Sequence, residues 1–219
     1  MLAQVSGGLA VHDRVRFTHW KTRVIPPGNK VSLVIVTHHR HRQLVSLLWA
    51  LRAQTHEDFE VLVAHDGPAD RDWSSVLKTS IDSDPRFTFE EHPRHVGQWG
   101  YPIRDLYERT RCTGEWVGGF ADDDWCCPVY LEWLLSEAIE KSADFVFCNF
   151  VHNHANWKPF TAIPQEGSIG IGGWLARRKL VESTPYADFG ETADGKHVAE
   201  MMKKTNRRAH VSGHIMVHG

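Results

Sequence analysis

The chain has 219 residues, enough for one domain of ordinary to large size, and its 42% hydrophobic and 24% charged content is typical of a globular protein. Its formal net charge of −2 at pH 7 gives no overall attraction to nucleic acid, so no nucleic-acid partner is expected and any site for a polyanion has to be local. No apolar run approaches the ~20 residues that span a bilayer, which predicts a cytoplasmic protein and leaves peripheral membrane association open.

The first 30 residues carry five Lys or Arg against one acid, show no firm periodicity and lack the continuous apolar core of a signal peptide. The four cysteines are too few and too irregularly spaced for a secreted disulfide framework. We therefore expect residues 1–30 to form an N-terminal arm, whose role the sequence does not give, and residues 31–219 to form a single domain.

Two continuously apolar segments, Val31–Val36 and Val61–Val63, are typical of strands buried on both faces of a parallel sheet. Between them, apolar residues recur at helical spacing: Leu44, Leu47, Leu48 and Leu51. Strand, helix and strand in about 35 residues form a βαβ unit, whose crossover should be right-handed.

The alternation of strands and helices continues along the chain. We expect a short helix over Ser74–Ile81, a strand over Phe87–Phe89, a helix marked by Ile103, Leu106 and Tyr107, a strand over Trp116–Phe120, a helix marked by Leu131, Leu134, Leu135 and Ala138, and a strand over Phe145–Val151. After residue 151 the pattern loosens, with helices predicted over Trp174–Val181 and Asp194–Lys204. The pattern up to about residue 120 predicts an open α/β sheet, in which ligands bind beyond the carboxyl ends of the strands.

Polar segments follow three of the predicted strands: Thr37–Arg40, His65–Gly67 and Asp122–Asp124. Because parallel strands end at the same edge of a sheet, these segments should line one crevice. Carboxylate oxygens are the ligands that hard cations such as Mg²⁺ or Mn²⁺ prefer. The three consecutive acids therefore point to a metal that holds a phosphate, and the alternative is a solvated acidic turn capping the helix that begins near Pro128.

A zinc site is the rival interpretation, with thiolate and imidazole ligands drawn from Cys126, Cys127, Cys148, His152 and His154. The spacing argues against it, because adjacent cysteines do not match the C-x₂₋₄-C arrangement of structural zinc sites. Cys148 also lies in the apolar run Phe145–Phe150, where a buried thiol behaves as a small hydrophobe.

The tryptophans fall into two groups. Trp99, Trp125 and Trp174 lie in predicted loops near the crevice, where aromatic faces can stack on sugar rings. Core packing is expected for Trp49, Trp116 and Trp133, which we assign to periodic apolar faces.

Over roughly residues 31–217 the chain resembles the family 2 glycosyltransferases of the GT-A fold. The matching segments, in the family's order and approximate spacing, are Val31–Thr37, the helix ending Ala53-Gln54-Thr55, the strand end His65-Asp66-Gly67, the strand entry Thr113-Gly114-Glu115-Trp116, and Asp122-Asp123-Asp124 before Pro128. The resemblance implies a single GT-A domain with an open, mostly parallel sheet flanked by helices. Its nucleotide-binding half would cover about 31–124 and its acceptor half about 125–219.

The resemblance also implies roles for individual residues. Thr37 and Asp66 match positions that hold the base and ribose of a nucleotide, and His39 matches a position where the family often places an aromatic ring that stacks on the base. Asp123 matches the metal-binding aspartate, and Asp122 its neighbour that contacts ribose or metal. The frequent D-x-D-D form is altered, because alanine occupies the place of its first aspartate.

A C-terminal histidine commonly completes the metal site in this family, and the segment Val211–Gly219 offers His218, in the more similar context, and His214. The Gly-rich acceptor loop of the family resembles Gly170–Trp174, which implies an acceptor or sugar pocket formed by Gly172, Gly173, Trp174 and Trp99. In the family an acid at the opening of the next helix serves as the base. That position matches Asp194, with Glu191 in reserve, and the alternative is a plain helix cap.

The function implied by the resemblance is transfer of a sugar from a nucleotide-diphosphate sugar, most often UDP-linked, to the hydroxyl of an acceptor, with Mn²⁺ or Mg²⁺ and with inversion. The acceptor could be a glycan, a lipid-linked sugar, a protein or a small molecule. Two other functions stay open: a nucleotidyltransferase that makes sugar nucleotides, and a non-catalytic module that binds them. The first would normally carry a Gly-rich phosphate loop after the first strand, and Thr37–His41 contains no glycine.

Overall fold

The computed structural model describes residues 24–71, 75, 77 and 84–219. Most of the expected N-terminal arm and of the expected helix Ser74–Ile81 lies outside these residues. Along the chain the elements are β1 (Val31–Thr37), α1 (His41–Arg52), β2 (Phe59–His65), β3 (Phe87–Glu91), η1 (Gln98–Gly100), α3 (Tyr101–Thr110), β4 (Trp116–Ala121), β5 (Trp125–Cys126), α4 (Tyr130–Glu140), β6 (Phe145–His152), η2 (Asn153–Ala155), β7 (Lys158–Phe160), η3 (Ile171–Gly173), β8 (Trp174–Arg177), α5 (Arg178–Glu182), α6 (Ala193–Lys204) and β9 (Arg208–His218).

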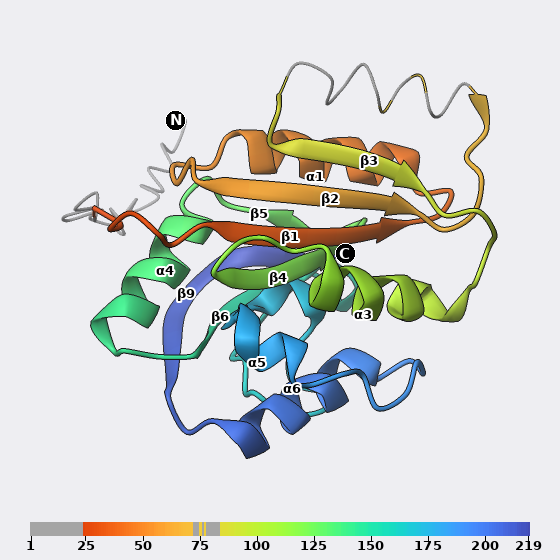
Figure 1. Cartoon of the computed structure of the whole chain (residues 1–219). Coiled ribbons are helices and arrows are strands. Elements are labelled where there is room, and N and C mark those ends of the chain that lie inside the picture. The colour runs from red at the N-terminus through yellow and green to blue at the C-terminus, as the bar shows by residue number, and fades with distance from the viewer. Residues whose placement is uncertain (1–23, 72–74, 76, 78–83) are drawn as a thin grey trace, which may run out of the picture.

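The described strands form one sheet in the order β3-β2-β1-β4-β8-β6-β9-β5, with β7 paired to β6. β1 is parallel to both β2 and β4, and β2 is parallel to β3, as the sequence predicted for this half. The second half is mixed, because β8 runs antiparallel between β4 and β6 while β9 runs parallel to β6. Helices α1 and α4 cover one face of the sheet, and α3, α5 and α6 cover the other (Figure 1).

The burial of side chains in β1 and α1 agrees with the pattern of apolar residues in the sequence, with one exception. Every residue of β1 is buried, as expected for a strand covered on both faces. The leucines predicted at helical spacing form the buried face of α1. Trp49, expected in the core, is instead 59% exposed, with the guanidinium of Arg52 over its ring. At 100° per residue it lies on the side of the helix away from the leucines, so that expectation was wrong.

The other two core tryptophans do contact the core. Trp116 is fully buried, and Trp133 is partly buried against the main cluster of buried apolar side chains.

The helix predicted over Trp174–Val181 is present only in its second half. Trp174–Arg177 forms strand β8, which fills the space between β4 and β6, and helix α5 begins at Arg178. Gly118 makes this pairing close, since a Cβ there would lie 2.7 Å from the carbonyl oxygen of Trp174. Pairing with two neighbouring strands therefore overrides the local helical pattern.

Among the described residues, no helix is long and apolar enough to cross a membrane.

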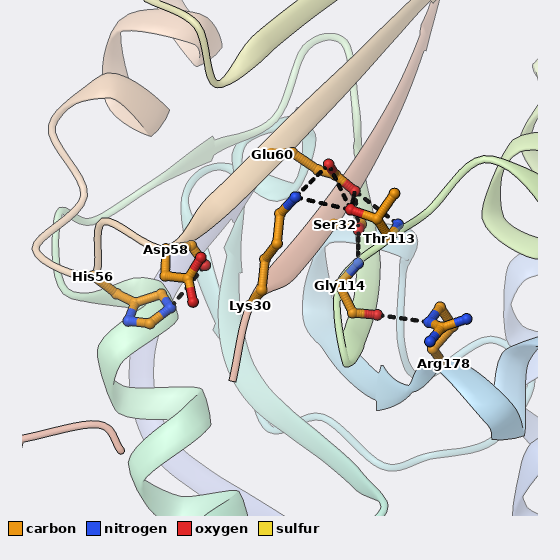
Figure 2. Close-up of polar contacts among 8 residues, drawn as sticks. All are labelled: Lys30, Ser32, His56, Asp58, Glu60, Thr113, Gly114 and Arg178. Atoms are coloured by element: carbon orange, nitrogen blue, oxygen red, sulfur yellow. Dashed lines mark hydrogen bonds and ion pairs between the residues drawn. The ribbon is translucent and has the colours of Figure 1, made fainter. Parts of the chain in front are cut away.

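The amino ends of β1, β2 and β4 are joined by one carboxylate, Glu60 of β2 (Figure 2). It accepts hydrogen bonds from Lys30 Nζ at 2.7 Å, from Ser32 Oγ at 2.5 Å and from the backbone N–H of Thr113 at 2.8 Å. The same Ser32 hydroxyl accepts the N–H of Gly114 at 2.8 Å. The Thr-Gly segment that carries part of the family resemblance thus fastens the edge of the sheet opposite the predicted crevice.

The pKa of Glu60 follows from these contacts. Burial alone would raise it, but the hydrogen bonds from Lys30, Ser32 and Thr113 outweigh burial and lower the pKa from 4.5 to about 2. A carboxylate whose pKa is lower in the folded state contributes stability that is full above pH 4.5 and is lost as the pH falls toward 2.

Replacing Glu60 with Gln should lower the free energy of unfolding at pH 7 by about 1.5–3 kcal/mol, because the donors lose a charged acceptor. The deficit should shrink as the pH is lowered below 4.5, where wild-type Glu60 begins to lose its advantage. Urea unfolding at several pH values measures this difference. Glu57→Gln, an exposed acid just before the same strand, is the matched control and should have little effect. A Glu60→Gln deficit that does not change between pH 7 and about pH 3, inside the window from 4.5 to about 2, would contradict the argument.

Candidate active site

A cleft of about 460 Å³ lies at the carboxyl ends of β1, β2 and β4, within the size range of ligand pockets. The predicted site residues that line it are Thr37, Asp66, Trp99, Asp122, Asp123, Glu191, Asp194 and His218. The C-terminus lies at this edge beside the ends of β1 and β4 and the start of α3 (Figure 1), and Gly219 itself lines the cleft. The rule that parallel strands share a carboxyl edge therefore predicted the location of this cleft.

Asp122 connects the first strand to the acidic segment. It is buried, and its Oδ2 accepts a hydrogen bond from Thr37 Oγ1 at 2.8 Å. Burial raises the pKa of Asp122, although the Thr37 hydrogen bond and the charge of Arg40 oppose that rise.

Arg40, at the start of α1, neutralises this acidic segment. Its Nη1 donates to Asp122 Oδ1 at 3.3 Å and to Asp123 Oδ2 at 2.5 Å. One guanidinium thus lies where two carboxylates converge, and this point of the cleft favours a cation.

Asp124 holds the end of the chain against the end of β4. Its Oδ2 accepts the N–H of Ala121 at 2.9 Å, while its Oδ1 lies 3.0 Å from His218 Nδ1 and accepts the N–H of Gly219 at 3.1 Å. The alternative of a solvated acidic turn therefore does not describe Asp124, which is buried. With Nδ1 engaged by Asp124, Nε2 is the nitrogen of His218 that can serve a ligand.

This contact also sets the charge of His218. Burial lowers its pKa, but the hydrogen bond and charge of Asp124, together with the charges of Asp123 and Asp194, outweigh burial and raise the pKa above 6.5. The other candidate, His214, is exposed on β9 and does not line the cleft. Of the two histidines, His218 is the one beside the acids.

The expected acceptor loop lies partly behind the cleft wall. Ile171 lines the cleft, whereas Gly172 and Gly173 are buried in η3 and are absent from its lining. Gly172 is required for packing, since a Cβ there would lie 2.3 Å from Met216 Cε and 2.7 Å from Asp124 Oδ2.

Trp174 is fully buried and stacks on Phe145, with ring centroids 5.8 Å apart. Its ring belongs to the core, so the expectation that it stacks on a sugar is corrected. The cause is the strand β8, in which Trp174 points into the layer between sheet and helices.

Asp194 lies in the first turn of α6, as predicted, and faces His218 across Gly170. A Cβ on Gly170 would lie 3.6 Å from His218 Nδ1 and 3.9 Å from Asp194 Oδ2, so both side chains approach the same backbone. Burial raises the pKa of Asp194, against the Gly195 N–H and the charges of His218 and Arg104. Glu191 also lines the cleft, just before the helix.

Asp66 is fixed by the loop that follows β3. Its two oxygens accept the N–H groups of Val96 at 2.7 Å and Gly97 at 2.9 Å. His38 lines the cleft beside it, whereas His39 is exposed and contacts His38 with the two rings tilted and their centroids 3.9 Å apart. His39 has a φ of +60° and does not line the cleft, so of these two histidines it is His38 whose ring lies beside Asp66 in the cleft. Stacking of His39 on a nucleotide base stays a prediction.

Trp99 stands at the edge of the cleft and is 70% exposed. It occupies a run of positive φ angles, at +54° for Gln98 and +51° for Trp99, between Gly97 and Gly100. A left-handed conformation at a non-glycine residue costs roughly 1–3 kcal/mol and persists where its surroundings impose it, often at functional sites.

Arg104 supports the cleft floor from α3. Its guanidinium donates to the carbonyl oxygens of Val34 at 2.6 Å and Phe120 at 2.7 Å, so it bridges β1 and β4. Its buried partner Glu108 lies 3.6 Å away, and burial raises the pKa of Glu108 to about 7 despite the charge of Arg104. Gly119 makes room for this cation, since a Cβ there would lie 2.1 Å from Arg104 Nη1.

The cysteines do not form the rival zinc site in the described residues. Cys126 and Cys148 are buried, and burial raises the pKa of both thiols, which disfavours the thiolates that zinc requires.

The sequence placed His38 and Arg40 in the segment Thr37–Arg40 that lines the cleft but gave neither a role, and it did not place His95, Tyr101 or Arg104 there. Two features of the sequence indicate such residues. Arg40 comes soon after a predicted strand, at the edge where the acids were expected. Gly119 lies inside a strand, which indicates that another group, here the Arg104 guanidinium, approaches the backbone closely.

The sequence model of Glycosyl transferase family 2 matches residues 32–184, and the chain belongs to this family. Its sheet and helices form the GT-A fold. The putative glycosyltransferase EpsH of Bacillus subtilis (strain 168) is 28% identical over 120 residues, which cover 55% of this chain and 33% of EpsH.

Solved structures share the fold. Residues 1–349 of S. aureus TarS superpose with a TM-score of 0.70 at 16% identity, over 86% of this chain and 60% of that one. The mannosyltransferase PcManGT from Pyrobaculum calidifontis superposes with a TM-score of 0.65 at 16% identity, over 85% of this chain and 56% of that one. The chain therefore spans less than two thirds of each of these relatives.

Gly119→Ala should lower the free energy of unfolding by about 1–3 kcal/mol, because the added methyl overlaps the Arg104 guanidinium and the Val34 carbonyl. Urea unfolding followed by circular dichroism measures the loss. Gly190→Ala, where the nearest atom would lie at an ordinary 3.5 Å, is the control. Equal stability of the two variants would show that Arg104 does not hold the cleft floor as described.

Proposed function

We propose that this chain transfers a glycosyl unit from a nucleoside diphosphate sugar to an acceptor hydroxyl. The observation that carries the proposal is the convergence in one cleft of Thr37, Asp66 and Asp122 from the strand ends with Asp194 from α6. Relatives support the class of donor. TarS has been solved with UDP and with UDP-GlcNAc, and PcManGT with GDP-Man and Mn²⁺. We propose a UDP-linked sugar for this chain, with a GDP-linked sugar as the second candidate.

In this proposal, Asp66 and Thr37 bind the nucleoside. The carboxylate of Asp66 is buried and held by two backbone N–H groups, so it presents a fixed acceptor at the end of β2. The ring of His38, beside Asp66, offers a face for the base.

The residues present fit a hard divalent cation, Mn²⁺ or Mg²⁺. Asp122 and Asp123 supply carboxylate oxygens, His218 supplies an imidazole nitrogen, and Arg40 already satisfies the demand for positive charge at this point. The cation, when bound, would stabilise the negative charge that develops on the leaving diphosphate. Arg40 would then exchange its carboxylate partners for the diphosphate, which a guanidinium binds equally well.

Asp194 is the proposed base. Its pKa is raised by burial, and a carboxylate with a raised pKa accepts a proton from an attacking hydroxyl more readily. Direct attack by that hydroxyl, without a covalent intermediate, inverts the anomeric centre. Trp99, at the mouth of the cleft, would stack on the sugar or the acceptor.

Two variants should change the binding of Mn²⁺ in opposite directions in the absence of nucleotide. Asp123→Asn removes a charged ligand and should weaken binding, whereas Arg40→Gln removes the competing cation from the same carboxylates and should tighten it. Titration of Mn²⁺ followed by electron paramagnetic resonance measures both. Weaker binding in both variants would mean that Arg40 does not compete with the metal, and unchanged binding in Asp123→Asn would overturn the metal assignment.

Asp194→Asn keeps the shape of the side chain but removes the proton acceptor. Transfer should fall by ~10²-fold or more, while UDP binding with Mn²⁺ stays close to that of the wild type. Turnover with a panel of sugar nucleotides, UDP binding by calorimetry and the anomeric configuration of the product by NMR measure the three consequences.

Glu191→Gln is the matched comparison, since Glu191 lines the same cleft. Normal transfer in Asp194→Asn with loss in Glu191→Gln would move the base to Glu191. Retained configuration in the product would refute inversion. UDP binding without transfer to any acceptor and without hydrolysis of the donor would favour a non-catalytic binding module.

A further inference from the structure

Two histidines flank Asp66 at the end of β2. His38 follows β1, and His95 lies in the loop between β3 and α3. One ligand atom from each of the three side chains lies within 4.8 Å of the other two. Among the described residues, no other group of three or more His, Cys, Asp or Glu side chains meets this condition, and Asp122, Asp123 and His218 do not. The cleft therefore holds a preassembled cluster of metal-ligating groups that is separate from the three acids.

The geometry of the cluster is set by Asp66. Its carboxylate is oriented by the N–H groups of Val96 and Gly97, and its Oδ2 lies 3.1 Å from His95 Nδ1. The ring of His38 lies beside that of His95, tilted against it, with centroids 4.3 Å apart. Because the His95 side chain is 57% exposed, it can rotate without disturbing the core.

Two imidazoles and one carboxylate form a donor set of intermediate softness. Such a set suits Zn²⁺, with a water molecule as the fourth ligand, better than it suits Mg²⁺, which prefers oxygen ligands alone. Tetrahedral coordination at a Zn–N distance of about 2.0–2.1 Å requires ligand atoms roughly 3.4 Å apart. The present separations are at most 4.8 Å, so rotation of the two imidazole rings by roughly 1 Å or a little more would close the site.

We propose that His38, Asp66 and His95 bind one Zn²⁺ ion, and that this ion competes with the nucleotide for Asp66. The competition rests on the proposed function, in which Asp66 binds the nucleoside. The metal site itself does not depend on that function. The mouth of the cleft thus has two cation sites of different chemistry: oxygen-rich beside Asp123, and imidazole-rich beside Asp66. Zinc bound at the second would act as an inhibitor of the enzyme.

The first measurement is titration of the full chain, freed of metal by chelation, with Zn²⁺ alone in a calorimeter. One site should be found, and His38→Gln and His95→Gln should each weaken it by about ten-fold or more. His92→Gln, Cys127→Ser and Asp123→Asn should leave it unchanged. His92 is a neighbour of His95 outside the cluster, Cys127 is the most accessible thiol of the rival zinc interpretation, and Asp123 belongs to the oxygen site. Zinc binding that is insensitive to both His38→Gln and His95→Gln would overturn the proposal.

The second measurement is the affinity for UDP with and without Zn²⁺, at constant Mn²⁺. Zinc should weaken UDP binding in the wild type and in His92→Gln, and should have no effect in His95→Gln. Zinc bound at the cluster without any change in UDP affinity would overturn the competition and leave the metal site intact. Failure to bind UDP in the absence of zinc would count against the proposed function instead, so the two failures are distinguishable.

Discussion

The candidate site depends on the contact between Asp124, at the end of β4, and the last two residues of the chain. One buried carboxylate accepts from the backbone of Ala121 on one oxygen and holds His218 and Gly219 on the other. That contact joins the segment after β4 to the end of β9, which are far apart in sequence, and it fixes the imidazole beside the acids. Gly172 leaves room for this carboxylate, because a side chain at position 172 would overlap it. The glycine of the Gly-rich loop is therefore required by the packing around Asp124, whether or not a ligand binds.

The two edges of the parallel half of the sheet are built differently. At the amino edge, Glu60 of β2 accepts hydrogen bonds from residues at the start of β1 and just before β4 and lies in a closed network. At the carboxyl edge, the polar groups line an open cleft. The segments that carry the family resemblance also have two kinds of role. Gln54, just after α1, bonds to the backbone of Cys127 and Leu131 and so has a structural role, whereas Asp66 and Asp123 line the cleft.

The two arginines of the cleft differ in how freely they can move. Arg40 is about half exposed and pairs with two carboxylates, while Arg104 is buried and cannot leave the carbonyl groups it bridges. The first is suited to exchange with a metal or a phosphate, and the second to fixing the distance between β1 and β4. In the altered D-x-D-D motif, the carboxylate of Asp122, the residue after Ala121, accepts the hydrogen bond of the Thr37 hydroxyl.

The sequence by itself determined the βαβ beginning, the carboxyl edge as the place of the site, and the membership of Thr37, Asp66, Asp122 and Asp123 in it. Those inferences rest on local periodicity and on the rule that parallel strands end together, and both are properties of short segments. The family resemblance added Asp194 and His218, and the cleft contains both.

Only the tertiary structure decided that Trp174 is core rather than pocket, that His38 rather than His39 faces the cleft, and that Arg40 joins the acids. Each depends on a contact between distant segments or on one backbone angle: the insertion of β8 between β4 and β6, the positive φ at His39, and the pairing of α1 with the end of β4. Such contacts produce no periodic pattern in the sequence. The free energy that selects them comes from strand pairing, burial and charge across the assembled sheet, and not from the neighbouring residues in the sequence.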